Sequence, residues 1–144
     1  MRVDFYQLSR DPAEKVLPLL ARNTLKAGER LLVVSSDEAQ LDRIGEALWA
    51  PKDSFLANGR AGSPHDWRQP VLLSDRPEPV NGAKFLALAD GVWREGDGAF
   101  ERTFYLFGED TLQPARDCWR MLGARDGVER RFWKQHGGKW VEGP

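Results

Sequence analysis

Three side chains are the first candidates for acid–base or nucleophilic chemistry near neutral pH: the single cysteine, Cys118, and the two histidines, His65 and His136. Cys118 falls on the apolar face of an expected helix, where a free cysteine commonly serves as a small core residue. Arg116 is near enough in sequence to lower the thiol pKa, so a nucleophilic role stays open, although no motif supports it. A general-base role is conceivable for His65, but neither histidine has a partner at metal-ligand spacing. We therefore expect no catalytic residue, no metal site and no disulfide.

The turn after the first expected strand lacks the features that bind a phosphate. Its sequence, Ser9-Arg10-Asp11-Pro12, contains no glycine, and Pro12 has no N–H to donate. Asp11 and Glu14 also place negative charge where a phosphate would lie. The pair Gly138-Lys139 is followed by Trp140 rather than by Ser or Thr, so the P-loop motif G-x-x-x-x-G-K-[ST] is absent too. The sequence predicts no nucleotide and no other cofactor.

Tryptophan is unusually frequent, with six residues in a chain of 144. This side chain is rarely left exposed without a reason and is common at the anchor points of protein interfaces. Trp133 and Trp140 fall in expected strands and are interpreted as core residues. Trp49 and Trp119 each lie beside a possible recognition element and are candidates for partner binding.

The helix that carries Trp119 has a basic stripe beside its apolar face. At 100° per residue, Leu112, Cys118 and Leu122 share one face. Arg116 and Arg120 lie one turn apart at its edge, with Trp119 between them and the core. An aromatic wall beside guanidinium groups suits a C-terminal aromatic residue, whose ring contacts the wall while its carboxylate meets an arginine. The alternative is a solvated basic helix edge on which Trp119 merely completes the core.

Apolar runs and turn residues predict the elements that hold these side chains. Strands are expected at Val3 to Leu8, Leu31 to Val34, Val71 to Leu73, Lys84 to Leu88, Arg102 to Phe107, Val128 to Lys134 and Lys139 to Val141. Helices are expected to begin at the N-caps Asp11, Ser36 and Asp110, and to end before Gly28, at Leu48 and before Gly123. Residues 50–70, rich in Pro, Gly, Asn and Ser, are expected to form a long irregular loop.

The strand–helix–strand–helix opening predicts an α/β fold. We expect one domain over residues 1–144, with a mostly parallel central sheet flanked by helices. The arrangement would be Rossmann-like but without a nucleotide-binding loop.

Charge is unevenly distributed along the chain, although the net charge is only −1. Residues 114–144 hold seven Lys and Arg against four Asp and Glu, whereas residues 1–113 hold 14 against 18. This asymmetry suggests an acidic partner near the C-terminus or, equally, random surface variation. It is too weak for a duplex-DNA-binding domain. No apolar run approaches the ~20 residues of a membrane span, and the N-terminus has no leader pattern, so we expect a cytoplasmic location without membrane contact.

Several segments, spread over nearly the whole chain, jointly resemble the chi subunit family of DNA polymerase III. They are Val3-Asp4-Phe5-Tyr6, the run from Leu25 to Val33, Glu46-Ala47-Leu48-Trp49, Asp53-Ser54-Phe55-Leu56, Gln69-Pro70-Val71-Leu72-Leu73, Asn81-Gly82-Ala83, Ala115-Arg116-Asp117-Cys118-Trp119-Arg120, Phe132-Trp133-Lys134-Gln135 and Gly138-Lys139-Trp140.

The resemblance implies an adaptor and not an enzyme. Chi subunits couple the clamp loader, through the psi subunit, to single-stranded-DNA-binding protein, whose acidic C-terminal tail ends in an Asp-x-Pro-Phe type sequence. Arg116 matches the tail-binding arginine of the family, and Trp119 and Arg120 match its aromatic and basic neighbours. Trp49 and Phe55 match residues that the resemblance places around the same pocket.

One departure concerns the wall of that pocket: Ala57-Asn58 stands where the family commonly has Pro-His after its Ser-Phe-Leu motif. The resemblance also allows an XPD-like helicase as a partner, and it implies no strong direct binding of DNA.

Two other classes of function stay open. One is an enzyme on a Rossmann-like scaffold, which would bind a nucleotide tightly. The other is a single-stranded-DNA-binding protein that uses stacking on Trp and Arg, which would bind oligonucleotides without a partner and with a steep salt dependence.

Overall fold

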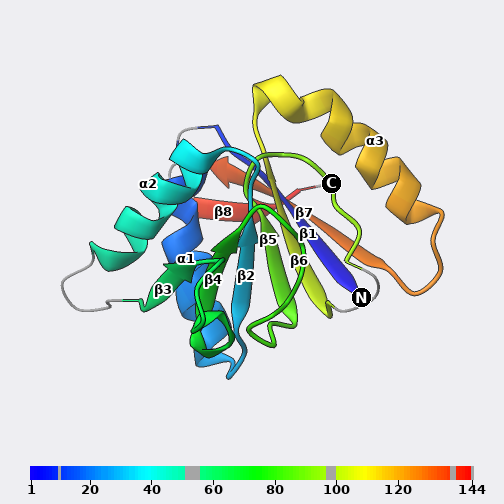
Figure 1. Ribbon diagram of the computed structural model, residues 1–144. Helices are drawn as coiled ribbons and strands as arrows, with labels where there is room; N and C mark the ends of the chain where they lie inside the picture. The colour runs from blue at the N-terminus through cyan, green and yellow to red at the C-terminus, as the bar shows by residue number, and fades with distance from the viewer. Residues whose placement is uncertain (10, 51–55, 97–99, 137–138, 144) are drawn as a thin grey trace.

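The computed structural model describes residues 1–9, 11–50, 56–96, 100–136 and 139–143. These residues form eight strands, three α-helices and two short 3-10 turns (Figure 1). The strands are β1 (Arg2–Gln7), β2 (Leu31–Val34), β3 (Asn58–Arg60), β4 (Val71–Ser74), β5 (Phe85–Leu88), β6 (Arg102–Phe107), β7 (Glu129–His136) and β8 (Lys139–Glu142). The helices are α1 (Ala13–Lys26), α2 (Glu38–Trp49) and α3 (Leu112–Gly123), and the 3-10 turns are Asp66–Arg68 and Glu109–Thr111.

The strands form one sheet in the order β3-β4-β2-β5-β6-β1-β7-β8. Every neighbouring pair is parallel except β7 and β8, which are antiparallel. The expected mostly parallel α/β sheet is confirmed. The strands β2 and β4 are buried along their whole length, as is usual where helices and loops cover both faces of a parallel sheet.

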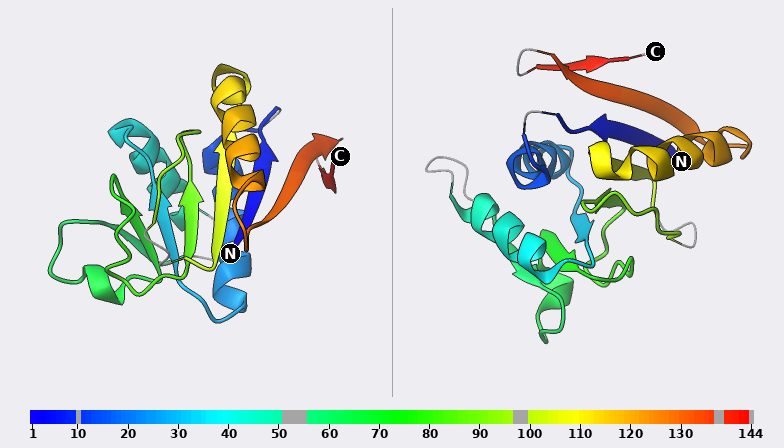
Figure 2. Two further views of the ribbon diagram at one scale, coloured as in Figure 1. Left: turned by 90° about the vertical axis from the view of Figure 1, so that its right-hand side faces the viewer. Right: turned by 90° about the horizontal axis from the view of Figure 1, so that it is seen from above.

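The helices divide between the two faces of the sheet, as Figure 2 shows in the view from above. Helices α1 and α2 cover one face, where Leu17, Leu41 and Ile44 pack against Val33 and Leu73. Helix α3 covers the other face with Ala115, Cys118 and Leu122, which join the core formed there by β1, β2, β5 and β6. Any site built on α3 is therefore separated by the sheet from any site built on α2.

All three expected N-caps are wrong. Helix α1 begins after Pro12, without a side-chain cap, while Asp11 pairs with Gln135 of β7 (Nε2 to Oδ2, 2.8 Å). Helix α2 is capped by Asp37, whose Oδ1 accepts from the backbone N–H groups of residues 39 and 40. Ser36 instead donates to Asp90 from its backbone and its hydroxyl. Helix α3 follows the 3-10 turn that contains Asp110, so that residue is not its cap.

The segment expected to be a long loop contains a further strand and a 3-10 turn. Strand β3 (Asn58–Arg60) pairs in parallel with β4 at one edge of the sheet. Its sequence, Asn-Gly-Arg, has neither apolar residues nor alternation, so nothing local predicts a strand there. Gly59 fits because a Cβ at this position would lie 2.8 Å from the Gln69 side chain.

A buried carboxylate joins three neighbouring strands. Asp4 of β1 is completely buried and accepts hydrogen bonds from Arg2 (Nη2, 2.9 Å), from Arg102 of β6 (Nε, 2.7 Å) and from Trp133 of β7 (Nε1, 3.0 Å). Both carboxylate oxygens accept hydrogen bonds from these side chains, two of which are positively charged, so the buried carboxylate has protein partners. Trp133 and Trp140 do pack against the α1–α2 core, as expected, but both are only partly buried.

Candidate functional site

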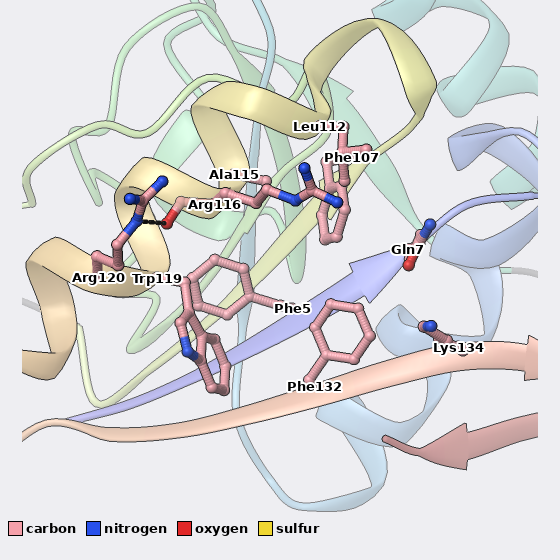
Figure 3. A pocket seen from close by; sticks show the side chains of 10 residues that line it. All are labelled: Phe5, Gln7, Phe107, Leu112, Ala115, Arg116, Trp119, Arg120, Phe132 and Lys134. Atoms are coloured by element: carbon pink, nitrogen blue, oxygen red, sulfur yellow. Dashed lines mark hydrogen bonds between the residues drawn. The ribbon is translucent and has the colours of Figure 1, made fainter. Parts of the chain in front are cut away.

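A pocket of about 470 Å³ opens between α3 and the strands β1, β6 and β7 (Figure 3). Its lining comprises Phe5, Gln7, Phe107, Leu112, Ala115, Arg116, Trp119, Arg120, Phe132 and Lys134. Among the described residues, three of the five sequence-predicted site residues meet here: Arg116, Trp119 and Arg120. The floor is apolar and the rim is basic, because the only charged groups in the lining are arginine and lysine.

Trp119 forms an aromatic wall together with two phenylalanines from different strands. Its ring meets Phe5 of β1 edge-to-face at 5.1 Å between centroids and Phe132 of β7 at 6.2 Å, nearly perpendicular. Edge-to-face pairs of this kind add to the stability gained from burial alone. The wall is therefore preformed, and Trp119 both packs against the core and lines the pocket.

The two arginines of α3 differ in how far they are already engaged. The Arg120 guanidinium pairs with Asp117 at 3.1 Å and is largely exposed. Within the described part of the chain, no hydrogen bond or ion pair engages the Arg116 guanidinium. Figure 3 shows that guanidinium over the pocket, on the same side as Gln7 and Lys134. Of these two arginines, Arg116 is thus the better placed to take an anion.

Two of the predicted residues do not join this pocket. Trp49 lies at the end of α2, on the opposite face of the sheet, with 51% of its surface exposed. It borders a separate hollow of about 540 Å³ that also includes Leu41, Gly45 and Arg60. The expectation that Trp49 surrounds the same pocket as Arg116 is therefore wrong. Phe55 lies outside the described residues.

The strand side of the pocket was missed by the sequence reasoning. Phe5 and Gln7 are two residues apart on β1 and so share one face, and the same holds for Phe132 and Lys134 on β7. The parallel register pairs Phe5 with Phe132 and Gln7 with Lys134. The period-2 pattern was visible in both segments. What the sequence did not indicate is that these two strands, far apart in the chain, are neighbours beneath α3.

The Cys118 thiol has a raised pKa, whereas the nearby Arg116 would have been expected to lower it. It is buried, and burial followed by the negative charge of Glu95 raises its pKa to about 12. A thiol in this state is a poor nucleophile at neutral pH. His65 is exposed, as is His136, and no group of three potential metal ligands occurs among the described residues.

At the carboxyl ends of β1, β5 and β6, where α/β folds commonly bind nucleotides, a third hollow is acidic. It is lined by Asp90, Glu109 and Asp110 together with backbone and polar groups. Burial alone would raise the pKa of Asp90, but hydrogen bonds from Arg94 and from the Ser36 backbone hold it below its usual value. Three carboxylates at this place oppose phosphate binding.

Comparison with known proteins agrees with the resemblance noted in the sequence. A family model described as DNA polymerase III chi subunit, HolC, matches residues 1–129. This chain belongs to the chi-subunit family of DNA polymerase III. A curated relative, DNA polymerase III subunit chi of Escherichia coli (strain K12), is 32% identical over 78 residues, which are 49% of this chain and 53% of that protein. The matched stretch thus spans about half the length of the relative.

The match to the chi family includes β1, β6 and the whole of α3, and it ends at the first residue of β7. The α3 pocket therefore lies mainly within the family's region, while Phe132 and Lys134 lie beyond it. None of the helices described here is both long enough and apolar enough to cross a membrane.

Proposed function

We propose that this chi-family protein is a non-catalytic adaptor of the DNA polymerase III holoenzyme, which binds the acidic C-terminal tail of single-stranded-DNA-binding protein in the α3 pocket. The observation that carries the proposal is the pairing of an aromatic wall with a guanidinium that has no partner among the described residues. A terminal phenylalanine would place its ring against Trp119, and its carboxylate would accept two hydrogen bonds from Arg116.

The rest of the tail is acidic, which suits the basic rim of the pocket. Arg120 and Lys134 lie at different ends of the lining, so an extended acidic chain passes a cation wherever it leaves the pocket. These exposed charges would mainly speed association and would be screened by salt. The carboxylate held by Arg116 would contribute more, because the ligand ring seated against Trp119 would shield that pair from water.

An adaptor also requires a second surface, and the sheet separates two candidates. Trp49 is exposed on the α2 face beside the hollow that contains Arg60. We assign the clamp-loader side of the bridge, through a psi subunit where one exists, to the α2 face.

The proposal predicts that the end of the tail matters more than its overall acidity. Titration calorimetry would compare the native tail peptide with a C-terminally amidated peptide and with one that lacks the final Phe. Amidation, or Arg116→Ala, is expected to weaken binding roughly 30-fold or more, as for a partly desolvated charge pair. Arg116→Lys should rescue poorly, because an ammonium group cannot form the bidentate contact.

Arg120→Ala is the matched comparison, because Arg120 lies one turn away and already pairs with Asp117. It should weaken binding only a few-fold, and that loss should shrink as salt is raised. Equal binding of the native and amidated peptides would contradict the proposed capture of the carboxylate. Tight binding of an oligo-dT strand by the isolated protein would favour a direct single-stranded-DNA-binding function instead.

A further inference from the structure

Arg130 contacts the aromatic wall from outside the pocket. This residue of β7 lies two positions before Phe132 and four before Lys134, so the three side chains share the face of the sheet beneath α3. Phe132 and Lys134 line the pocket, whereas Arg130 does not. Its guanidinium carbon lies 4.2 Å from the centroid of the Trp119 ring, and its Nη1 donates to the Trp119 backbone oxygen at 2.7 Å.

The two contacts join Arg130 to both the backbone and the ring of Trp119. The hydrogen bond fixes the guanidinium to the backbone of α3 near the C-terminal end of the helix, where a positive charge is favoured. From that anchor the planar group lies over the indole ring, which is the geometry of a cation–π contact. Phe5 and Phe132 meet the ring edge-to-face, so the ring is confined from several directions.

Gly123 provides the space that this arrangement needs. A Cβ at this last residue of α3 would lie 2.7 Å from Nη1 of Arg130 and 2.8 Å from its guanidinium carbon. Only the end of a flexible side chain is in the way, so an alanine would displace Arg130 without straining the backbone of the helix. Glycine at position 123 and arginine at position 130 thus act as a matched pair.

We propose that Arg130, admitted by Gly123, is a positioning residue that sets the Trp119 ring for binding of a C-terminal aromatic residue. This assignment rests on the proposed function of the α3 pocket and goes beyond it, because Arg130 itself does not contact the ligand. A ring held in one orientation before binding has less freedom to lose when the ligand arrives. Arg130 therefore affects the affinity of the pocket through Trp119.

The test compares Arg130→Lys and Gly123→Ala with Arg131→Lys as the control. Arg131 is the next residue of β7, points to the opposite face and pairs with Glu129 at 3.6 Å. Lysine at 130 keeps the charge near the end of the helix but removes the planar group. Alanine at 123 keeps the arginine but moves its guanidinium; the gain in helix propensity offsets the contacts that are lost, so the urea midpoint should change little.

Two quantities are measured: the affinity for the native tail peptide and the indole N–H resonance of Trp119 in the free protein, assigned with Trp119→Phe. Arg130→Lys and Gly123→Ala should each weaken binding about five-fold, which is the effect expected from losing one cation–π contact. Each should also shift or broaden the Trp119 resonance. Arg131→Lys should change neither. A purely structural role of Arg130 would lower the urea midpoint of Arg130→Lys and leave peptide affinity unchanged in Gly123→Ala.

The outcomes separate this assignment from the proposed function. If wild type fails to bind the tail peptide, the proposed function falls and this assignment falls with it. If wild type binds and the Arg130→Lys and Gly123→Ala proteins bind equally well, the function stands and only the positioning role of Arg130 is overturned. A weakened affinity together with an unchanged urea midpoint in Gly123→Ala would support the assignment most directly, because loss of stability could not then explain the loss of binding.

Discussion

The Cys118 thiol and the Arg116 guanidinium are two residues apart on one helix, yet they have opposite surroundings. Cys118 points into the core beneath α3, and its pKa is raised to about 12 by burial. Arg116 is exposed at the rim of the pocket. A helix turns 200° over two residues, so closeness in sequence did not place the guanidinium beside the thiol.

Cys118→Ala should leave tail binding intact and lower the free energy of unfolding by about 1 kcal/mol, as for loss of a small buried side chain. Its pH dependence is a sharper signature. The folded thiol has a higher pKa than the unfolded one (~8.5), so its stabilisation is complete below pH 8.5 and is lost as pH rises. Urea unfolding at pH 8 and pH 10 should show a larger loss of stability in wild type than in Cys118→Ala. Parallel losses would show that the thiol ionises normally.

Trp119 and Trp133 should separate by mutation. Trp133→Ala removes packing against Tyr6 and leaves the buried Asp4 with one donor fewer, so it should destabilise the domain by about 3 kcal/mol. Trp119→Ala should weaken tail-peptide binding more than its loss of stability explains. Urea midpoints and peptide affinities, measured on both proteins where each is fully folded, would decide. If the loss of peptide affinity relative to the loss of stability is the same in both variants, Trp119 has no special role in the pocket.

At the scale of elements, the sequence was informative where a pattern is local. The four-residue apolar run from Leu31 to Val34 became β2 unchanged, and the spacing of Leu41, Ile44 and Leu48 identified the buried face of α2. The α3 side of the pocket followed from the same 3.6-residue period. These patterns depend only on which side of an element is buried, and that information is present within a few residues.

The sequence failed where the answer depends on contacts between distant segments. Strand β3 exists because β4 is there to pair with it, and its own residues carry no strand pattern. The N-caps were misplaced because Asp11 and Ser36 are used by Gln135 and Asp90, which come from other parts of the fold. For the same reason the strand wall of the pocket was missed, since it requires knowing that β1 lies next to β7.

The cap of α2 provides a direct test at this scale. Asp37→Ala should lower the free energy of unfolding by about 1 kcal/mol, because two backbone N–H groups lose their acceptor. Ser36→Ala is the matched control: it loses its hydroxyl bond to Asp90, but the backbone N–H bond at 3.0 Å remains. Urea denaturation should therefore rank Asp37→Ala as the more damaging change. The reverse order would restore Ser36 as the cap.

For the whole molecule, the placement of Trp49 and Arg116 on opposite faces of the sheet predicts that two partners bind independently. Trp49→Ala should reduce recovery of clamp-loader subunits in a pull-down without changing tail-peptide affinity. Arg116→Ala should do the reverse. In the double variant the two losses should simply add, because the two sites lie on opposite faces of the sheet and share no lining residue. Loss of peptide binding in Trp49→Ala would show that the two faces are coupled or that the α2 surface is misassigned.

The position of β1 within the sheet also governs the order in which the protein can fold as it is synthesised. Strand β1 is synthesised before the other seven described strands, but its neighbours are β6 and β7, about 100 and 127 residues later in the chain. Until Arg102–Phe107 has emerged, the apolar strand beginning at Arg2 has no partner on either side, and the Asp4 carboxylate lacks the donors of Arg102 and Trp133. The N-terminal segment must therefore wait for most of the chain, a delay that non-local sheets impose on folding. A nascent chain halted near residue 100 would expose β1 as an unpaired apolar strand, which is the form of the protein most open to a chaperone or to aggregation.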